Sequence, residues 1–569
     1  MGYEEAERTW RAQAEELERL RPAQPWLRET EGGLPVKPVY GPHDHGASRS
    51  DDEFLERLGF PGAPPFTRGG YPTGHRHVLW QTQQIVGYGT AEETRERLQY
   101  ILRQGQSGHR AAVLNVVFDQ PTLNGLDSDH RLARGAVGKG GVAIDSLGDM
   151  ATLIEPFDPR ETFISLVVTG MGPIMFALYA QACVDRGVPL DRISGVMLND
   201  PLTAYYGART YILPPRPSLR LFGDFVGFCT ERAPKWNTVG VSGYHAREAG
   251  ATAAMELGFT IACGLAYVQE CVDRGLDPNV FAARFSFFLE VGNDFFEEIA
   301  KLRAFRRVWA GELARRFGVT DPRALLMRCH VQTAGSSCTA QEPENNIVRT
   351  AIQALAAVLG GTNSLHTNAM DEALSIPSET SARIALRTQQ IIACETGATR
   401  VADPLGGSYY VEAQTDAIEQ EGRRYLAEID GFGADIRDGV LAALDAGYFH
   451  ELIREQAWQT QLLLESGERP VVGVNCFAND GAEVNIDLFR GDPAFERKQL
   501  ERLRAWRAGR DGAAVEAALA GVRAATETSG NMIPLLMDAV KAGTTVGELV
   551  PVLREAWGTY DEPHPLALS

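Results

Sequence analysis

The stretch Asn237–Ala254, NTVGVSGYHAREAGATAA, indicates how the middle of the chain folds. Its β-branched run, Thr238 to Val241, is typical of a short buried strand. The residues after Tyr244 and His245, AREAGATAAMELGFTIACGLAYVQE, have the composition of a long helix. A short turn separates the two elements, and that turn contains the histidine. The sequence therefore predicts a strand–turn–helix unit that presents His245 at the carboxyl end of a buried strand.

The same rhythm recurs between about residues 75 and 400, where apolar strand candidates alternate with helical segments. The chain offers eight candidates: one near WQTQQIVGYG, then AAVLNVVFD, TFISLVVTG, ISGVMLND, NTVGVSGYH, ARFSFFLEVG, LLMRCHVQT and LGGTNSLHTN. Continuous apolar strands alternating with helices predict a parallel sheet that is buried on both faces. Eight such units favour an α/β fold of the closed (β/α)8, or TIM, barrel class over residues 66–410. A doubly wound open sheet is the alternative, although no GxGxxG follows a strand.

Two further regions flank this unit. Residues 1–65 begin with a charged helix and continue into an irregular stretch, LPVKPVYGPHDHGASRS, which predicts an extended arm used for subunit contacts. Residues 411–569 are rich in Arg, Glu and Ala and predict a mostly helical region with one apolar strand candidate, RPVVGVN. Within the central unit, Phe163–Val184 carries no charge over a length that could span a bilayer. Because GMGP interrupts it, we interpret it as a buried strand, a turn and a buried helix.

Composition and charge argue against several classes of function. A formal net charge of −19 disfavours a general nucleic-acid binder. Eight scattered cysteines without a CxxC pair indicate neither a disulfide framework nor a zinc site. The histidines of HDH and HRH (His43, His45, His75 and His77) lack a matching ligand set, so no metal is predicted. The charged N-terminal helix is not a secretory signal, and the expected location is the cytoplasm.

Polar and ionisable side chains gather where the predicted strands end. They are Asp119, Asn199, Asp200, His245, Arg284, Ser286, His330, Gln332, His366 and Asn368. In a barrel enzyme the carboxyl ends of the strands form the active face. Each residue alone is better explained by a satisfied structural hydrogen bond, because buried polar groups need partners. On several strands together, they predict a functional site.

Several blocks of the chain resemble a known family. WNTVGVSGYHAREAGAT, ARFSFFLEVGNDFFEEIAKLRAFRRVWA, NNIVRTAIQALAAVLGGTNSLHTNAMDEAL and ADPLGGSYYVE are similar to the large, catalytic chain of the adenosylcobalamin-dependent acyl-CoA mutases. That family includes the methylmalonyl-CoA, isobutyryl-CoA and 2-hydroxyisobutyryl-CoA mutases, and the resemblance covers about residues 65 to 480. It implies an isomerase whose (β/α)8 barrel takes the pantetheine arm along its axis. Adenosylcobalamin would cover the carboxyl-terminal face and drive a radical rearrangement of the acyl carbon skeleton.

The resemblance also implies roles for individual residues. His245 would donate a hydrogen bond to the migrating thioester carbonyl. Glu372 would hold the adenosyl ribose, with Asn368 nearby. The other positions that match the cofactor face are Phe118, Gln120, Gly140, Glu248, Gly335 and Ala373, and those that match the substrate site are Arg284, Ser286, His330 and Gln332.

One motif of the family is absent from the sequence. Members that bind cobalamin within a single chain carry DxHxxG in a Rossmann-like domain, and no DxHxxG occurs here. We therefore expect no such domain in this chain. The resemblance then implies the large subunit of a two-chain enzyme, with cobalamin carried by a separate small subunit. The expected assembly is a heterodimer or a dimer of heterodimers.

Departures from the family pattern bear on the substrate. Ile85 and Ala208 stand where the methylmalonyl-CoA enzymes have a tyrosine and an arginine around the substrate carboxylate. A buried carboxylate without such a cation is costly, although Arg209, the next residue, could in principle reach it. Val117 stands at the place of an aspartate in the 2-hydroxyisobutyryl-CoA enzyme, which argues against a hydroxylated substrate.

The remaining departures also make the expected pocket more apolar. Val167 and Leu198 stand where the family usually has a threonine and a glutamine. Val78 and Gln83 occupy positions near the CoA entrance that are often arginines. The sequence thus predicts a mutase for a short, branched, non-dicarboxylic acyl-CoA, isobutyryl- or pivalyl-like. The alternatives are a mutase for an unusual or differently carried acyl thioester, a 2-hydroxyisobutyryl-CoA mutase, and a non-catalytic paralogue that only binds thioester or partner.

Overall fold

The computed structural model describes the chain except for residues 1, 23–37, 40–49, 107–111, 480–485 and 563–569. The described part contains nine strands: β1 (Gln81–Thr82), β2 (Ala112–Val117), β3 (Thr162–Val167), β4 (Ser194–Met197), β5 (Trp236–Asn237), β6 (Val239–Ser242), β7 (Phe285–Val291), β8 (Cys329–Thr333) and β9 (Ser364–His366). All eight predicted strands are confirmed. The fifth is divided at Thr238, whose N–H donates to the carbonyl of Arg284 at 3.2 Å.

The strands form two parallel sheets, of order β1-β9-β8-β7-β6 and β2-β3-β4-β5. The two sheets are joined at both edges. Val86, just beyond β1, pairs in parallel with Val116 of β2. On the other side, the N–H of Gly240 in β6 donates to the carbonyl of Leu198, next to β4, at 3.1 Å. The architecture is therefore mixed α/β with parallel strands, as predicted.

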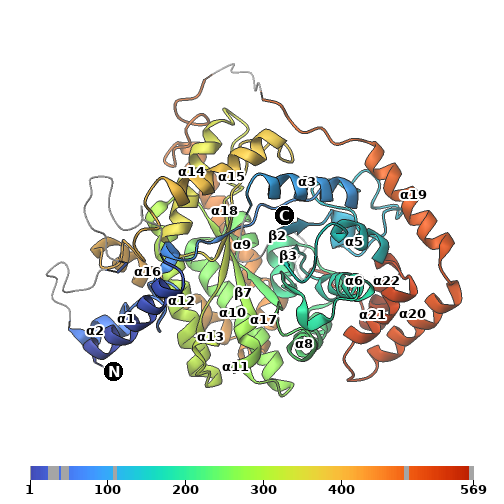
Figure 1. Ribbon diagram of the computed structural model, residues 1–569, viewed down its shortest axis with the longest axis horizontal. Helices are drawn as coiled ribbons and strands as arrows, with labels where there is room; N and C mark the ends of the chain where they lie inside the picture. The colour runs from blue at the N-terminus through green and yellow to red at the C-terminus, as the bar shows by residue number, and fades with distance from the viewer. Residues whose placement is uncertain (1, 23–37, 40–49, 107–111, 480–485, 563–569) are drawn as a thin grey trace.

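Helices surround the strands (Figure 1). From β1 to the first helix after β9, the α-helices are α3 (Ala91–Arg103), α4 (Gln120–Leu123), α5 (Leu147–Ile154), α6 (Gly172–Asp185), α7 (Pro201–Thr203), α8 (Pro215–Arg232), α9 (Tyr244–Glu248), α10 (Ala253–Asp273), α11 (Pro278–Phe281), α12 (Phe295–Phe317), α13 (Pro322–Leu325), α14 (Asn345–Leu359) and α15 (Glu379–Cys394). The single long helix predicted after His245 is divided in the structure: α9 ends at Glu248, and α10 follows the N-cap residue Thr252, whose Oγ1 accepts the N–H of Met255. The uncharged run Phe163–Val184 forms β3 and α6, as predicted. No helix within the described ranges is long and apolar enough to cross a membrane.

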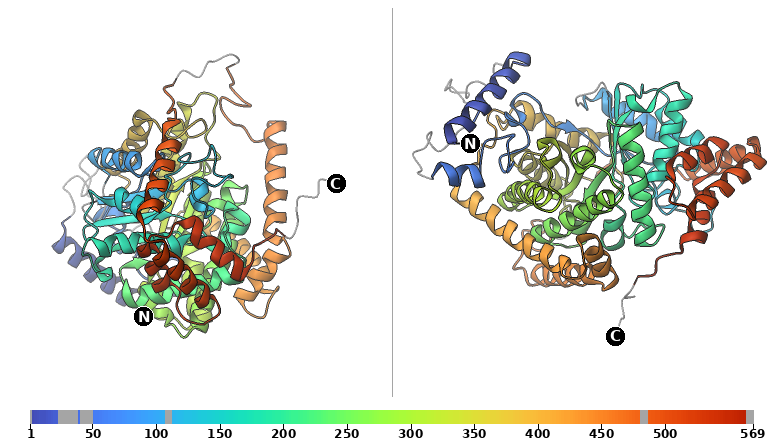
Figure 2. Two further views of the ribbon diagram at one scale, coloured as in Figure 1. Left: turned by 90° about the vertical axis from the view of Figure 1, so that its right-hand side faces the viewer. Right: turned by 90° about the horizontal axis from the view of Figure 1, so that it is seen from below.

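The first and last helices of the chain lie on opposite sides of the molecule (Figures 1 and 2). They are α1 (Tyr3–Leu20) and α2 (Asp51–Arg57) at one side, and α19 (Ala494–Gly509), α20 (Gly512–Thr526), α21 (Ile533–Ala542) and α22 (Val546–Trp557) at the other. Tyr3 and Trp10 of α1 pack with Phe54, Phe60 and Ala402 in a small core of their own. Most of the predicted extended arm lies outside the described residues.

The region after residue 410 is helical, as predicted, with α16 (Tyr409–Asp430), α17 (Ile436–Asp445) and α18 (Tyr448–Ser466) before α19. The prediction of a strand at RPVVGVN is wrong. The N–H groups of Val474 and Asn475 both donate to the carbonyl of Val471, at 3.0 and 3.1 Å, and Gly473 has φ +80°. These bonds fold the apolar segment into a turn, because a glycine in the left-handed region reverses the chain.

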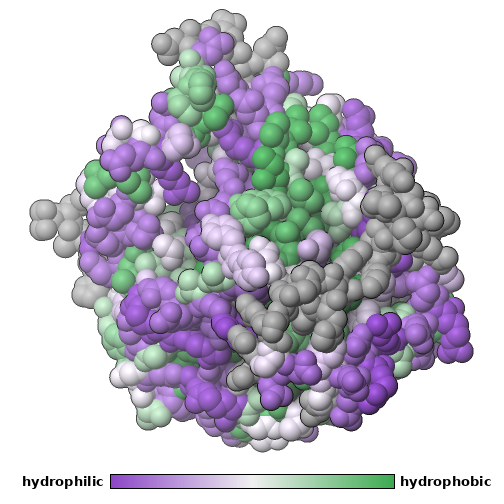
Figure 3. Space-filling view, turned by 90° about the vertical axis from the view of Figure 1, so that its left-hand side faces the viewer, coloured by the Kyte–Doolittle hydropathy of each residue, from purple (hydrophilic) through white to green (hydrophobic). Residues whose placement is uncertain are grey.

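Part of the molecular surface is apolar. Figure 3 shows the side that lies at the left in Figure 1, where apolar side chains gather in the upper part and hydrophilic ones cover most of the lower part. Among the exposed apolar residues are Val348 and Ile352 of α14 and Ile391 of α15. A surface of this kind is typical of a contact with another protein.

Candidate functional site

Two cavities lie in series among the strands. The inner cavity has a volume of about 210 Å³ and is lined by residues from β1 to β9, including Tyr71 and Leu79 at its exposed end. The outer cavity has a volume of about 440 Å³ and lies at the carboxyl ends of the strands. Ile85, Val167 and Phe288 line both cavities and form the boundary between them.

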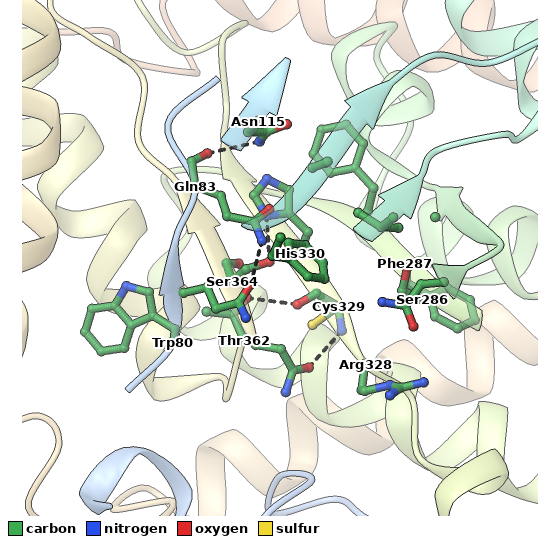
Figure 4. Close-up of a pocket in the computed structure, with 18 of the residues that line it drawn as sticks. Trp80, Gln83, Asn115, Ser286, Phe287, Arg328, Cys329, His330, Thr362 and Ser364 are labelled. Atoms are coloured by element: carbon green, nitrogen blue, oxygen red, sulfur yellow. Dashed lines mark hydrogen bonds between the residues drawn. The ribbon is translucent and has the colours of Figure 1, made fainter. Parts of the chain in front are cut away.

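Polar side chains from different strands point into the inner cavity (Figure 4). Asn115 of β2 donates from Nδ2 to the carbonyl of Gln83 at 3.1 Å. His330 of β8 has its Nδ1 at 2.8 Å from Ser364 Oγ of β9. Burial, reinforced by the nearby His366, lowers the pKa of His330 to about 3, so the imidazole is neutral at physiological pH.

Four buried polar atoms that line the inner cavity lack a hydrogen-bond partner among the described residues. They are His75 Nε2, Asn115 Oδ1, Asn237 Oδ1 and His330 Nε2. Leaving such an atom without a hydrogen bond costs about 1–3 kcal/mol, so a ligand that supplies these hydrogen bonds would be bound favourably. The two amide oxygens accept hydrogen bonds, and a neutral imidazole nitrogen either donates or accepts one. The cavity therefore suits an elongated ligand that carries both donors and acceptors.

The sequence predicts His245 in a turn, but the residue lies in the second position of the short helix α9, just after β6, and it faces the outer cavity. Its Nδ1 is 2.7 Å from Ser242 Oγ, at the end of β6. Burial lowers the pKa of His245 to about 4. The imidazole is therefore neutral at physiological pH. In the tautomer in which Nδ1 accepts the Ser242 hydroxyl, the ring proton is on Nε2 and is available to a ligand.

Aromatic and amide groups hold the surroundings of His245. The Tyr244 ring stacks on Phe288, with ring centroids 4.7 Å apart and planes inclined by 14°. Gln332 donates from Nε2 to Tyr244 Oη at 2.8 Å and to Asn368 Oδ1 at 3.1 Å. These contacts tie α9 to β7, β8 and the segment after β9, so the floor of the outer cavity is rigid.

A charged cluster lies behind α9. Arg247, from the same short helix as His245, pairs with Glu298 at 2.8 Å and lies within 3.9 Å of Glu256 and Glu290. Lys301, which is fully buried, pairs with Glu256 at 2.6 Å and with Glu298 at 2.5 Å. Burial raises the pKa of Glu290 well above its ordinary value, and Glu248 adds to the effect. Two cations thus face three carboxylates, and burial favours the protonated form of Glu290.

Two carboxylates lie at the open end of the outer cavity. Glu248 accepts hydrogen bonds from the backbone N–H groups of Gly335 at 2.6 Å and Ser336 at 3.1 Å. Glu372 lines the outer cavity, and its carboxylate has no hydrogen bond to any residue in the described part of the chain. Burial raises the pKa of Glu372 to about 7, with Glu248 and Asp371 adding to the shift.

The strand ends gather fewer residues than the sequence predicted. Asp119, Asn199, Asp200, His245, Gln332, His366 and Asn368 lie at or beyond the carboxyl ends of their strands. The prediction is wrong for three residues: Arg284 precedes β7, and Ser286 and His330 are second residues of β7 and β8. Strand β7 continues through FFLEV to Val291, so its carboxyl end lies farther along the chain. Ser286 and His330 line the inner cavity instead.

The other predicted residues are distributed as follows. The outer cavity is lined by Ile85, Val117, Gly140, Val167, His245, Gln332 and Glu372, and the inner one by Gln83, Ile85, Val167, Leu198, Ser286 and His330. Phe118 is buried, whereas Gln120 and Ala373 are exposed. Asn368 lies beside the outer cavity because it accepts a hydrogen bond from Gln332, and Glu248 and Gly335 are hydrogen-bonded to each other at its open end. Ala208 and Arg284 line neither cavity. The guanidinium of Arg209 is directed to Glu562, at 3.9 Å, and is half exposed.

Several lining residues carried little signal in the sequence. Phe288 is one of three phenylalanines in an apolar run, and nothing distinguishes it from its neighbours. Asn115 was detectable, because an amide in the middle of AVLNVV interrupts an otherwise apolar strand and requires a partner. The positions of Asn237, at the end of β5, and of Arg97, on α3, are evident only from the three-dimensional structure.

The chain is an α/β isomerase, and comparison with known proteins shows its family. The sequence profile of the family described as Methylmalonyl-CoA mutase matches residues 29–559. The chain belongs to this family, which confirms the resemblance found in the sequence.

Three relatives illustrate the range of the family. The chain is 41% identical to the 2-hydroxyisobutanoyl-CoA mutase large subunit of Aquincola tertiaricarbonis, over 94% of this chain and 92% of that one. It is 40% identical to the methylmalonyl-CoA mutase large subunit of Streptomyces virginiae, over 94% of this chain and 71% of that one. It is 39% identical to the methylmalonyl-CoA mutase of Escherichia coli K12, over 94% and 73%. The three identities are too similar to one another to indicate a substrate. The substrate has to be inferred from the residues of the site.

Proposed function

We propose that the chain is the large subunit of an adenosylcobalamin-dependent mutase for a short, branched, uncharged acyl-CoA of the isobutyryl or pivalyl type. The observation that carries this proposal is the apolar boundary between the two cavities, formed by Ile85, Val167 and Phe288, with Val117 alongside. The cationic side chain on the outer lining, Arg97, donates to the carbonyl of Pro377 at 2.9 Å. None of the described residues at the boundary itself is a cation, which disfavours a dicarboxylic acyl group there.

The carrier is proposed from the inner cavity. A pantetheine chain contains two amides, each with one donor and one acceptor, and the unpartnered atoms of Asn115, Asn237 and His330 call for such groups. The cavity leads from the exposed Tyr71 and Leu79 to the apolar boundary, as a thioester at the end of a long arm requires.

The proposal includes a closed barrel. Eight parallel strands, linked at both sheet edges through Val86–Val116 and Gly240–Leu198, support a (β/α)8 barrel over residues 66–410. In this division residues 1–65 are an N-terminal arm and residues 411–569 a helical region, both on the outside. Inside a closed barrel, reactive species are shielded from water.

His245 is the residue proposed to act on the reacting group. A neutral imidazole at the edge of the apolar boundary can donate its Nε2–H to the thioester carbonyl and stabilise charge that develops on its oxygen. Ser242 fixes the ring through Nδ1, and Gly207 allows close approach, because a Cβ there would lie 2.9 Å from His245 Cβ.

The residues at the open end fit adenosylcobalamin. The Glu372 carboxylate has no hydrogen bond to the part of the chain that the structure describes, which suits a ribose diol. A Cβ at Gly335 would lie 3.2 Å from the Glu248 carboxylate, so a glycine keeps this surface clear. Glu372 and Asn368 would hold the adenosyl group, and Phe118, Gln120, Gly140, Glu248, Gly335 and Ala373 would lie toward the corrin. When bound, the cofactor supplies the radical that starts the rearrangement.

Glu372 provides a test that needs no turnover. Its folded-state pKa of about 7 lies above the ordinary value of 4.5, so the folded protein favours the protonated form. Stability is therefore highest below the ordinary pKa and falls as the pH rises through about 7, by up to about 3 kcal/mol. We expect Glu372→Gln to raise the thermal midpoint at about pH 8 and to leave it unchanged at about pH 4.5.

The same variant should bind adenosylcobalamin less tightly in the two-chain complex, by about tenfold, measured as a dissociation constant. Glu395→Gln, on the exposed end of α15, is the matched control and should change neither quantity. A Glu372→Gln variant that is more stable but binds the cofactor as before would contradict the assigned contact. A variant of unchanged stability at about pH 8 would show that burial does not raise this pKa.

A small cobalamin-carrying subunit is proposed as the partner. Two of the relatives are named large subunits, and this chain covers 92% of the one from A. tertiaricarbonis. We place the pair in the cytoplasm, as a heterodimer or a dimer of heterodimers. The apolar surface seen in Figure 3 is available for assembly.

The proposed substrate is tested with a panel of acyl-CoA esters. The chain, a cobalamin-binding small subunit and adenosylcobalamin are mixed without oxygen, and products are identified by mass spectrometry. We expect isobutyryl-CoA or pivalyl-CoA to exceed methylmalonyl-CoA in kcat/KM by about a hundredfold or more, because the boundary has no free cation for a carboxylate. Preference for 2-hydroxyisobutyryl-CoA would replace the proposal with the activity named for the A. tertiaricarbonis relative. Preference for methylmalonyl-CoA would overturn the argument from Ile85 and Val117.

A further inference from the structure

The segment that carries Ala208 has an unusual backbone. Residues Ala204–Ala208 form a π-helix, which directly follows α7. The next residue, Arg209, has φ +52° and ψ +37°, in the left-handed region that residues with a side chain rarely adopt. π-Helical turns and strained residues of this kind persist where surrounding contacts hold them, and they are frequent at functional sites. Because Gly207 lies against His245, this segment shares a border with the proposed active site.

The described residues after α22, 558–562, pack against this segment and are named here the C-terminal tail. After α22 the chain turns at Gly558, and the Tyr560 ring lies edge-on to Tyr205, at 4.6 Å between centroids, and to Tyr211, at 5.1 Å. Tyr205 and Tyr211 stack on each other at 5.2 Å. The three rings form one cluster, named here the tyrosine cluster. Tyr211 also donates from Oη to Glu562 at 3.3 Å.

The other side of the segment is held by α18. His450 lies with Nε2 at 3.0 Å from the carbonyl of Tyr205. The Tyr206 ring stacks on Phe449, with centroids 4.5 Å apart and planes inclined by 12°. The π-helix is thus clamped between two elements that are distant in sequence, α18 and the C-terminal tail. Neither of them lines the inner or the outer cavity.

We propose that the C-terminal tail, through Tyr560, is a positioning element that fixes the π-helix against His245 and so sets the acyl-group selectivity of the site. The proposal rests on the function proposed above. A loose π-helix would let Gly207 move away from His245 and Ala208 change its place, which alters the room available next to the imidazole. Aromatic packing of this kind stabilises a local structure beyond the burial of its area. Tyr560 touches neither cavity, so it acts only through the segment it holds.

Hydrogen exchange tests the clamp without substrate or cofactor. In Tyr560→Ala, we expect the backbone amides of residues 204–211 to exchange about tenfold faster than in the unchanged chain, with β7 and β8 unaffected. Tyr560→Phe keeps the ring and should exchange like the unchanged chain. Trp557→Ala is the matched control, because it removes an aromatic side chain three residues earlier that packs on Arg220 and not on the tyrosine cluster.

Selectivity tests the consequence for the site. In the assembled two-chain enzyme, Tyr560→Ala should change the ratio of kcat/KM for pivalyl-CoA over isobutyryl-CoA by about fivefold or more, whereas Tyr560→Phe and Trp557→Ala should not. General destabilisation lowers both rates together and leaves this ratio unchanged. Unaltered exchange of residues 204–211 in Tyr560→Ala, or an unaltered ratio, would overturn the inference. Failure of the unchanged enzyme to rearrange either ester would instead refute the proposed function, and the exchange experiment would still decide whether Tyr560 clamps the π-helix.

Discussion

His245→Ala is expected to lower kcat by about 10²–10³-fold with little change in KM for the preferred acyl-CoA, because the lost hydrogen bond strengthens as charge develops on the carbonyl oxygen. The side chain is held by Ser242 and faces the outer cavity, so its removal leaves the apolar boundary in place. The measurement is steady-state kinetics of the assembled enzyme, with isomer products determined by mass spectrometry. A fall in kcat/KM caused only by a higher KM would contradict the role, because it would indicate uniform binding of substrate.

The pH dependence separates a neutral from a charged donor. Because burial lowers the pKa of His245 to about 4, its imidazole remains neutral over the whole physiological range. We therefore expect no inflection from this residue in kcat between about pH 6 and about pH 8. An inflection near the ordinary histidine pKa that disappears in His245→Ala would show that the imidazolium is the active form. Ser242→Ala, which removes the partner of Nδ1, should reduce kcat less than His245→Ala does.

Lys301→Met is expected to be the most destabilising single change in the buried charge cluster. Lys301 is fully buried and pairs with Glu256 and Glu298, so its removal leaves carboxylates without a countercharge in the interior. Breaking a buried ion pair on one side costs about 3–5 kcal/mol. Arg247 belongs both to this cluster and to α9, the helix that carries His245. Disturbing the cluster should therefore also displace His245 and lower the activity. The measurement is the midpoint of thermal or urea unfolding together with the yield of folded protein.

Lys498→Met is the matched control for this change. Lys498 pairs with Glu93 at 2.7 Å, but its side chain is exposed. An exposed ion pair is screened by water and salt, so no measurable change in the unfolding midpoint is expected. Equal unfolding midpoints for Lys301→Met and the unchanged chain would contradict this expectation. They would mean that the cluster rearranges so that its carboxylates are neutralised without Lys301. Recovery of stability in a Lys301→Met, Glu298→Gln double variant would support the charge argument.

The strands and the position of His245 were predictable because they depend on local pattern. A β-branched run followed by a turn and a helix identifies the unit that ends in His245, and the same pattern identifies the other strands. The limits of a strand are less well determined by pattern. The sequence places Arg284 at the wrong end of β7 because the polar residues of ARFSFFLEVG are spread along it and do not reveal where pairing begins. The turn at Gly473 was mistaken for a strand because its valines suit both.

Long-range features were not predictable from pattern. The boundary between the cavities depends on Phe288, which is indistinguishable from its neighbours in the sequence. The raised pKa of Glu372 results from burial and from Glu248, more than a hundred residues away. The packing of Tyr560 on Tyr205 joins the last part of the chain to its middle. Such contacts have no local signature, because they are created by the fold itself.

The serial arrangement of the two cavities has a kinetic consequence. The inner cavity reaches the surface beside Tyr71 and Leu79, whereas the outer one lies at the opposite, carboxyl ends of the strands. A small molecule that enters the inner cavity beside Tyr71 and Leu79 would not compete with a protein that binds at the carboxyl ends of the strands. Many rounds of loading and discharge can then take place during the lifetime of one protein complex. In the proposed two-chain enzyme, an acyl-CoA would then exchange through the inner cavity without separation of the two subunits.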